Sequence, residues 1–202
     1  MDMITEFHFS PEELETIVPE IYKNSRIEHV RGCVQTVKEL CRRYSPESAE
    51  DMIRAAYLHD ITKKYSLPFQ LILCRKYGIL LTDDETSSPA VIHAITGASV
   101  AKSIFDENET VVRSIRWHTT GRPQMTKEEI IMFLSDMIEP TRDYPELNEI
   151  RSAVDSSLYY GLEIALKRSL EFIESKGQVI HPATREAYRW ICDYNSQNGV
   201  VL

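Results

Sequence analysis

The sequence is poor in glycine and in strand-like patterns. It contains seven glycines in 202 residues, and stretches in which apolar and polar residues alternate are nearly absent. Apolar residues recur instead at the three- and four-residue intervals that are typical of amphipathic helices. This pattern argues against a sheet, and the sequence predicts an all-α protein.

Several motifs of other protein classes are missing as well. No apolar run approaches the roughly 20 residues that cross a bilayer, and the opening stretch MDMITEFHFS has neither the basic nor the apolar region of a signal peptide. No G-x-x-x-x-G-K-[ST] or G-x-G-x-x-G loop occurs, which excludes a glycine-rich phosphate cradle. We therefore expect no membrane partner, and a nucleotide would have to be bound in another way.

The four cysteines are scattered and form no C-x-x-C pair. Cysteines among aliphatic and aromatic neighbours are typically small buried hydrophobic residues that stay reduced. We therefore expect a cytoplasmic protein without disulfides. The cysteines are Cys33, Cys41, Cys74 and Cys192.

Acidic residues outnumber basic ones. The 31 Asp and Glu residues against 23 Lys and Arg give a formal net charge of -8 at pH 7. We expect no nucleic acid partner, because phosphate backbones are bound by clustered Lys and Arg. A small anionic substrate is compatible with this charge, since it needs only a local positive site such as a metal ion.

Helix start signals divide the chain into segments. Ser10, Pro11 and Glu13 form a capping box with proline at the first helical position, which predicts a helix to about Tyr22. Residues 82–88 are polar and predict a loop. We expect one helical domain over residues 1–202, with a motif core at about 25–143 and C-terminal helices within 146–196. Ser25 with Glu28 and Thr126 with Glu129 repeat the capping box at two later helix starts. Further helices are predicted at 26–44, 46–60, 67–77, 89–105, 109–118, 127–139, 146–175 (with a break) and 182–195.

Four of the six histidines and two aspartates follow one another in an order that indicates a metal site. Imidazole nitrogens and carboxylate oxygens together suit iron, manganese, zinc and related ions. Helices are rigid enough to direct such ligands to one point. The adjacent His59 and Asp60 point roughly 100° apart on a helix, so both face one site only near a helix end, where the pattern places them. The six residues are His29, His59, Asp60, His93, His118 and Asp136.

The two other histidines stand apart from this order. His8 lies near the N-terminus, where we expect it to be exposed. His181 precedes Pro182 at a predicted helix start, which favours a capping or loop role over metal binding.

The ordered residues carry a resemblance to a known family. The series His29, His59-Asp60 and Asp136 resembles the H…HD…D framework of the HD phosphohydrolase superfamily, which implies the HD-domain helical bundle as the fold. The surrounding blocks resemble the YqeK subfamily of symmetrical dinucleoside tetraphosphatases. These blocks are residues 26–30, 55–63, 93–98, 115–121 and 136–142.

The resemblance implies a hydrolase that converts diadenosine tetraphosphate to two ADP with a metal-bound hydroxide. It implies iron as the metal, as one or two ions, with manganese, cobalt or zinc as alternatives. Asp60 would also bridge to a second ion held by His93 and His118, or these two histidines would bind the phosphate directly. The primary metal site that the superfamily implies is His29, His59, Asp60 and Asp136.

Further residues are candidates for contacting the phosphates beside His93 and His118. The ammonium of Lys63 would neutralise charge that develops on the phosphoryl oxygens, and a solvated surface lysine is the alternative. Arg142 would bind a phosphate bidentately, or else form a salt bridge to a nearby glutamate, Glu139 or Glu146. Thr119 would line the phosphate pocket. The residues expected to carry catalysis are Lys63, Asp60, His93 and His118.

Three other functions would use the same residues. An oxygen-using di-iron enzyme needs a pocket without phosphate clamps, so Lys63 and Arg142 argue against it. A regulatory HD module that only binds a nucleotide would be indicated by missing ligands, and none is missing. An HD-type nucleotidase or phosphodiesterase that acts on another nucleotide stays an alternative, as does assembly into a homodimer.

Overall fold

The computed structural model describes residues 9–22 and 25–199, and in this part of the chain it contains helices and no strand. The prediction of an all-α protein is confirmed. None of the described helices is both long and apolar enough to cross a membrane. The elements are α1 (Pro11–Ile21), α2 (Ser25–Tyr44), η1 (Pro46–Ser48), α3 (Ala49–Leu58), α4 (Leu67–Lys76), α5 (Asp83–Ser87), η2 (Pro89–Val91), α6 (Ile92–Ile104), α7 (Glu109–Trp117), α8 (Lys127–Ile138), α9 (Leu147–Ser156), α10 (Leu158–Ser175) and α11 (Pro182–Gln197).

Capping residues start helices where the sequence predicts them. The Ser10 hydroxyl accepts the Glu13 N–H, and the Glu13 carboxylate accepts the Ser10 N–H, so both halves of the capping box are present at α1. Thr126 and Glu129 repeat the arrangement at α8. Each box provides partners for N–H groups that the helix itself leaves free, which is why these starts are readable from the sequence.

The prediction of a loop over residues 82–88 is wrong. Residues Asp83–Ser87 form the short helix α5, which begins with a capping box between Thr82 and Glu85. Glu85 also forms an ion pair with Arg116 of α7, with 2.5 Å between Oε1 and Nη2. The capping box and this tertiary contact together stabilise a helix that has no apolar face.

The long segment predicted at 146–175 does break, and the break lies at Ser157. This residue is extended, with φ -162° and ψ 139°, and it separates α9 from α10. The two helices then pack closely, because a Cβ atom on Gly161 would lie only 2.4 Å from Cγ2 of Val154. Glycine therefore permits the close approach that turns one predicted helix into an antiparallel pair.

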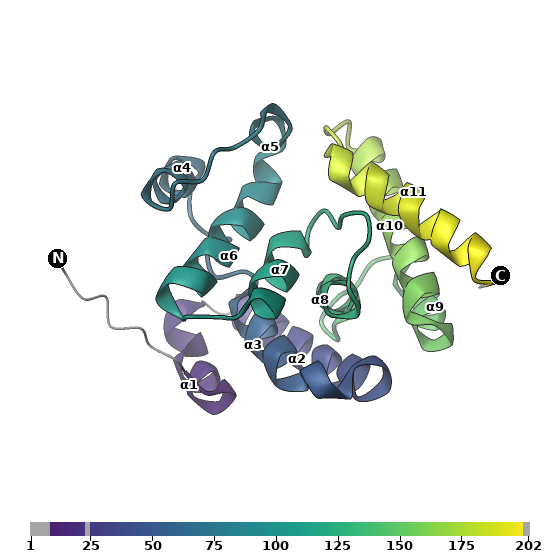
Figure 1. Cartoon of the computed structure of the whole chain (residues 1–202), viewed down its shortest axis with the longest axis horizontal. Coiled ribbons are helices and arrows are strands. Elements are labelled where there is room, and N and C mark those ends of the chain that lie inside the picture. The colour runs from purple at the N-terminus through teal and green to yellow at the C-terminus, as the bar shows by residue number, and fades with distance from the viewer. Residues whose placement is uncertain (1–8, 23–24, 200–202) are drawn as a thin grey trace.

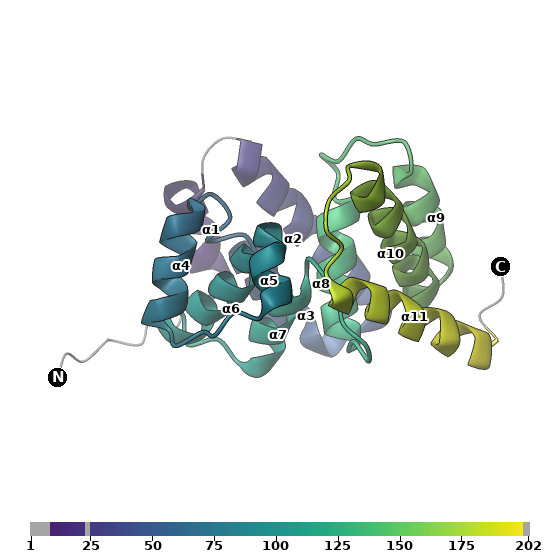
Figure 2. The ribbon, with the colours of Figure 1, turned by 90° about the horizontal axis from the view of Figure 1, so that it is seen from above.

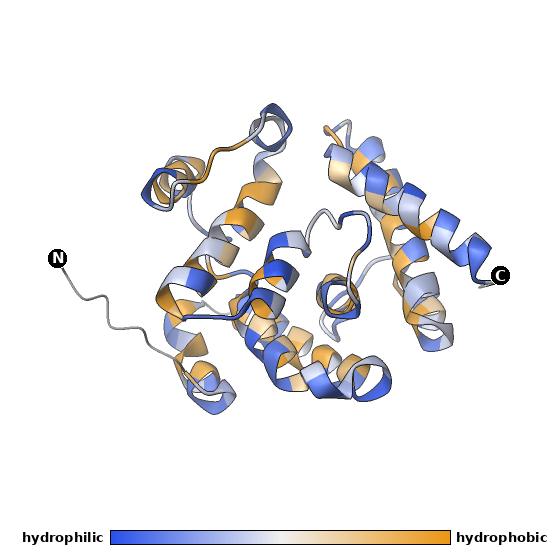
Figure 3. Ribbon diagram, in the orientation of Figure 1, coloured by the Kyte–Doolittle hydropathy of each residue, from blue (hydrophilic) through white to orange (hydrophobic). Residues whose placement is uncertain are grey.

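The helices enclose one continuous apolar core. Helix α8 contacts α2, α3 and α7 on one side and α9 and α10 on the other, and the C-terminal helices lie together at the end of the molecule opposite α1 and α4 (Figures 1 and 2). Most helices have one hydrophobic and one hydrophilic side (Figure 3). Each large side chain buried in this core contributes roughly 1.5–3 kcal/mol. Fully buried members include Val30, Leu58, Ile115, Phe133 and Leu162.

A buried ion pair anchors the helix that leads into the histidine–aspartate pair. Arg54 of α3 donates two hydrogen bonds of 2.8 Å to the carboxylate of Glu107, and the two side chains are 3% and 1% exposed. Such bidentate contacts are geometrically specific. They hold α3 against the segment before α7, and the C-terminal ends of both helices reach the candidate site.

Candidate metal centre

The six predicted metal-site residues converge from five segments of the chain. His29 lies in α2, His93 in α6 and Asp136 in α8. His59 with Asp60 directly follows α3, and His118 directly follows α7. Each of the four histidines is at most 5% exposed. The structure thus gathers residues that lie as far as 107 positions apart in the sequence into one buried cluster.

Asp60 lies between two pairs of histidines. Its Oδ2 atom is 3.7 Å from Nε2 of His29 and 3.5 Å from Nε2 of His59. Its Oδ1 atom is 3.2 Å from Nε2 of His93 and 3.7 Å from Nε2 of His118. One carboxylate therefore faces both pairs, each with a different oxygen.

Asp136 completes the His29 side of the cluster. Its Oδ1 atom is 3.2 Å from Nε2 of His29. Burial alone would raise the pKa of Asp136, but the hydrogen bond to His29 and the charges nearby outweigh it and hold that pKa far below the usual value. Burial would also raise the pKa of Asp60, but the neighbouring histidines lower it more and hold it well below its usual value. Both carboxyl groups are therefore ionised, as metal ligands must be.

Backbone carbonyls determine the tautomer of three histidines. The Nδ1 atoms of His59, His93 and His118 lie 2.8, 2.7 and 2.7 Å from the carbonyl oxygen of the residue three positions earlier. Because a carbonyl oxygen only accepts, Nδ1 carries the proton. With the proton on Nδ1, the Nε2 atom of each of these rings presents its lone pair to the centre of the cluster. Contacts of this kind orient the histidine ligands of metal sites.

This arrangement leaves electron-rich atoms facing one another. The Nε2 atoms of His93 and His118 are 3.1 Å apart, and those of His29 and His59 are 3.3 Å apart. Burial lowers the pKa of His93 to about 4, which keeps its ring neutral. Oδ1 of Asp60 is buried without a hydrogen-bond donor among the described residues. Lone pairs at these distances repel unless a cation lies among them, so the residues fit one or two divalent metal ions.

Glu139 holds the outer nitrogen of His29. Its Oε1 atom lies 3.1 Å from Nδ1 of His29, and its carboxylate accepts the N–H and the hydroxyl of Thr141, both at 2.6 Å. The side chain is 1% exposed. A carboxylate at this nitrogen fixes the orientation of a ligating ring and makes the opposite nitrogen more basic. The sequence pattern points to Glu139 only as a salt-bridge partner, and its position three residues after Asp136 is the signal that could have revealed this contact.

Cys33 also lies against the cluster, one helical turn after His29. Its Sγ atom is 3.6 Å from Nε2 of His29, and its ligand atom lies within 4.8 Å of those of His29, His59 and Asp136. Burial raises the pKa of the Cys33 thiol well above its usual value, and the charges of Asp136 and Glu139 add to this effect. Cys33 is therefore a neutral thiol beside the ligands, a position that its apolar sequence neighbours do not reveal. All four cysteines are unpaired.

Lys63 is an exposed residue, but its ammonium group lies against the cluster. Its Nζ atom lies 3.1 Å from Nε2 of His93. Burial lowers the pKa of Lys63, while the charges of Asp60 and Asp136 act in the opposite direction. The structure thus places a cation where a phosphoryl group beside the histidines would meet it.

Two arginines lie at the His29 end of the cluster. Arg26 is 2.7 Å from Oδ2 of Asp60, and Nε of Arg142 donates to the carbonyl of Asp136 at 2.7 Å. Arg142 also forms an ion pair with the Asp136 carboxylate. Both arginines and Lys64 line a cavity of about 400 Å³ that reaches His29. Arg26 belongs to the R-x-x-H block, yet the sequence pattern does not single it out as a site residue.

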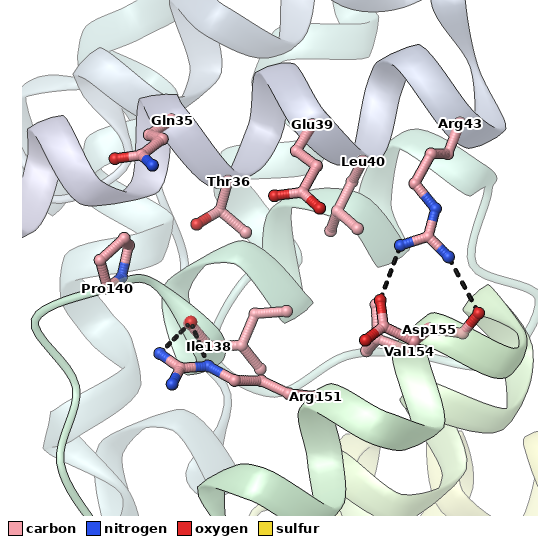
Figure 4. Close-up of a pocket in the computed structure, with 10 residues that line it drawn as sticks. All are labelled: Gln35, Thr36, Glu39, Leu40, Arg43, Ile138, Pro140, Arg151, Val154 and Asp155. Carbon is pink, nitrogen blue, oxygen red and sulfur yellow. Dashed lines mark hydrogen bonds and ion pairs between the residues drawn. The ribbon is translucent and has the colours of Figure 1, made fainter.

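Another cavity, of about 350 Å³, lies beside α2 and α9 and contains none of the six metal-site residues (Figure 4). Its arginines are engaged within the protein. Arg43 is 2.8 Å from Oδ1 of Asp155, and Arg151 donates to the carbonyl of Ile138 at 2.9 Å (Figure 4). Arg151 thereby binds the C-terminal end of α8, the helix that carries Asp136, which indicates a structural role.

His181, one of the two histidines outside the ordered set, is not part of the cluster. His181 begins α11, and its Nδ1 atom accepts the N–H of Ala183 at 3.2 Å, which confirms the predicted capping role. His8 lies outside the described residues.

Comparisons with known proteins show which family and which relatives this chain resembles. The family model described as HD domain matches residues 26–141. The symmetrical bis(5'-nucleosyl)-tetraphosphatase of Bacillus subtilis is 32% identical over 184 residues, which cover 89% of this chain and 96% of that protein. A protein of the same name from Halalkalibacterium halodurans is 31% identical over 180 residues, covering 87% and 92% of the two chains. A crystal structure described as a predicted HD superfamily hydrolase involved in NAD metabolism, from Clostridium acetobutylicum, has a TM-score of 0.87 and 28% identity, covering 93% of this chain and 99% of that one.

Proposed function

Because the chain belongs to the HD domain family, we propose that it is a metal-dependent hydrolase that cleaves diadenosine tetraphosphate symmetrically to two ADP. The observation that carries the proposal is the buried cluster in which Asp60 faces two pairs of histidines whose lone pairs converge. The two relatives named symmetrical tetraphosphatases support the substrate and the products.

The proposed metal is iron, as one or two ions, because imidazole and carboxylate ligands together suit it; manganese, cobalt and zinc share this preference. When bound, such an ion lowers the pKa of a water ligand from about 15.7 towards about 7 and polarises phosphoryl oxygens. The proposed ligands are His29, His59 and Asp136 on one side of the cluster and His93 and His118 on the other, with Asp60 shared between them.

The cations of the chain would hold the tetraphosphate. Lys63, beside His93, is placed to neutralise charge that grows on the phosphoryl oxygens during the reaction. A guanidinium has five N–H donors, and the contacts of Arg26 and Arg142 with the aspartates use only some of them. The remaining donors can bind phosphate oxygens at the His29 end. Thr119 lies at the opposite end of the cluster, directly after His118, where the cavity that it lines begins.

Symmetrical cleavage follows from the position of the clamped phosphates. The oxygen of one water forms a bond to one of the two inner phosphorus atoms and gives up a proton, and the bond from that phosphorus to the central bridging oxygen breaks. The departing ADP takes the bonding electrons and leaves as an anion. If one ADP unit is held on each side of the cluster, the central anhydride is the bond that lies over the reacting centre.

Product analysis tests this function. The protein is purified without added metal, its bound metals are measured, and diadenosine tetraphosphate is supplied as substrate. We expect ADP as the single nucleotide product, resolved by ion-exchange chromatography. Equal amounts of ATP and AMP would contradict the proposed cleavage point. Rapid hydrolysis of nucleoside monophosphates without turnover of the tetraphosphate would assign the chain to another HD activity.

We further propose that residues 1–202 act as one domain, because side chains from α1, α2, α3 and each of α6 to α11 join a single apolar core. The cytoplasmic location stays a prediction, which rests on the unpaired cysteines.

A further inference from the structure

A second cavity adjoins the metal cluster at the end formed by His93 and His118. Its volume is about 510 Å³, within the range of roughly 300–1,000 Å³ that is usual for small-molecule sites. The turn between α10 and α11 forms one wall and lies opposite α5 in both views (Figures 1 and 2). The rest of the lining comes from Lys63, from residues 87–91 before α6, and from Thr119 and Thr120 after His118.

Three residues of this lining carry buried polar atoms that have no hydrogen-bond partner in the described part of the chain. They are Oγ of Ser88, Oγ1 of Thr119 and Nε2 of His181. Because Nδ1 of His181 accepts the Ala183 N–H, the proton of the neutral ring lies on Nε2, which is a donor without an acceptor. Ser88 is 8% exposed. Buried polar groups almost always have partners, so these three side chains have hydrogen-bonding capacity that the described part of the chain does not use.

The chemistry of the lining suits a ligand that is anionic at one end and neutral along the rest. Among the described lining residues, Lys63 is the one charged side chain apart from His181. Its ammonium group lies against His93. Apolar surface comes from Val91, Ile173 and Val179. A ribose and a base offer hydroxyl groups, ring nitrogens and flat apolar faces, and their phosphates would extend past Lys63 to the metal cluster.

We infer that this cavity binds the ribose and the base of one ADP half of the substrate, with His181, Ser88 and Thr119 as its hydrogen-bonding residues. The inference rests on the proposed function and deepens it. The turn between α10 and α11 would then recognise the nucleoside. This turn lies outside residues 26–141, which the HD domain model matches.

Calorimetric titration of the metal-loaded full-length protein tests this assignment with two probes, ADP and inorganic pyrophosphate. Pyrophosphate shares the phosphates of ADP but has no nucleoside. Ser88→Ala removes an unpartnered hydroxyl, and His181→Ser removes the Nε2 donor while serine still caps a helix. Each change should raise the Kd for ADP by about 2- to 10-fold, and both together by about 10-fold or more. The Kd for pyrophosphate and the metal content should not change.

Ser135→Ala is the matched control, because the Ser135 hydroxyl is also buried without a partner but does not line the cavity. It should bind ADP like the wild type. Ser88→Ala should also unfold at the wild-type temperature, since the hydroxyl has no partner in the described structure to lose.

The outcomes distinguish a failure of the cavity assignment from a failure of the proposed hydrolase function. A double variant that binds ADP as tightly as the wild type overturns the cavity assignment, and so does an equal loss of ADP and pyrophosphate binding. In either case, a wild type that still releases ADP from diadenosine tetraphosphate leaves the proposed function standing. A wild type that neither releases nor binds ADP overturns both.

Discussion

Gly32→Ala adds one methyl group behind His29, at a point where the structure has no room for it. An alanine Cβ at this position of α2 would lie 2.3 Å from Oε2 of Glu139, while ordinary contacts begin at about 3.4 Å. The carboxylate would therefore have to move by about 1 Å. It is not a free side-chain end, because Thr141 and His29 hold its oxygens at 2.6 to 3.1 Å.

The expected cost is the difference between two opposing effects. Replacing glycine by alanine inside a helix stabilises it by roughly 0.5–1 kcal/mol. Moving the carboxylate weakens at least one hydrogen bond to a charged group, which is worth about 1.5–3 kcal/mol. We therefore expect Gly32→Ala to lower the free energy of unfolding by about 1–2 kcal/mol. Because the same carboxylate orients His29, metal affinity should fall by about 10- to 100-fold.

Two measurements check this prediction. Urea unfolding of the metal-free protein gives the stability, and competition with a chelator gives the metal affinity. Gly97→Ala is the control, since it is also a buried helical glycine but its Cβ would meet its nearest neighbour, the carbonyl of His59, at 3.4 Å. It should be neutral or slightly stabilising.

A double-mutant cycle decides whether the cost comes from Glu139. In a Glu139→Ala background the obstructing carboxylate is gone, so Gly32→Ala should there be neutral or stabilising. An equal cost in both backgrounds would refute the proposed clash. Unchanged metal affinity in Glu139→Ala would refute its role in orienting His29.

Four further changes have expected outcomes. Asp60→Ala removes the carboxylate between the histidine pairs, so metal analysis should show most metal lost and turnover should fall by at least about 100- to 1,000-fold, whereas full metal content with near wild-type turnover would contradict the assignment. Lys63→Met keeps the aliphatic stem without the charge, so metal should stay while kcat falls by about 10- to 1,000-fold, and an unchanged kcat would argue for a bystander lysine. Arg54→Met removes the two hydrogen bonds that the guanidinium donates to the buried Glu107 carboxylate, which should cost about 3–5 kcal/mol in urea unfolding; a loss below 1 kcal/mol would contradict this. Burial alone would raise the pKa of Glu128, but hydrogen bonds from its own backbone N–H and from serine hydroxyls outweigh it and lower that pKa below the ordinary 4.5. The stabilisation from this carboxylate is therefore present above pH 4.5 and lost as the pH falls through the lowered value, so Glu128→Gln should flatten the acid side of the Tm profile, and parallel profiles would count against it.

Most helices and the order of the ligands are properties that the sequence alone determines. Ser10 and Thr126 start helices through hydrogen bonds to residues three positions away, and such short-range contacts need no tertiary structure. The break at Ser157, by contrast, separates two helices whose close packing needs a glycine, Gly161, beside Val154. The six metal-site residues are recognisable because their spacing matches a family framework, not because any one of them is distinctive.

Other features depend on contacts between distant segments. Helix α5 has a local signal in the capping box of Thr82 and Glu85, but part of its stabilisation comes from Arg116 of another helix. Glu139 reaches His29 across 110 positions, and only Gly32 leaves it the space. The sequence pattern gives Cys33 an apolar environment, whereas the fold adds a contact with His29.

The chemical state of the site is also a tertiary property. In His59, His93 and His118, the position of the ring proton depends on nearby carbonyl groups, whose direction is set by the helix ends. The lone pairs converge because of the way in which α2, α3, α6 and α7 pack. The cavity beside Thr119 and His181 exists only because the turn between α10 and α11 closes over the end of α7. A sequence pattern records the residue types and local hydrogen bonds, while distances between remote side chains are set by the packing of the whole core.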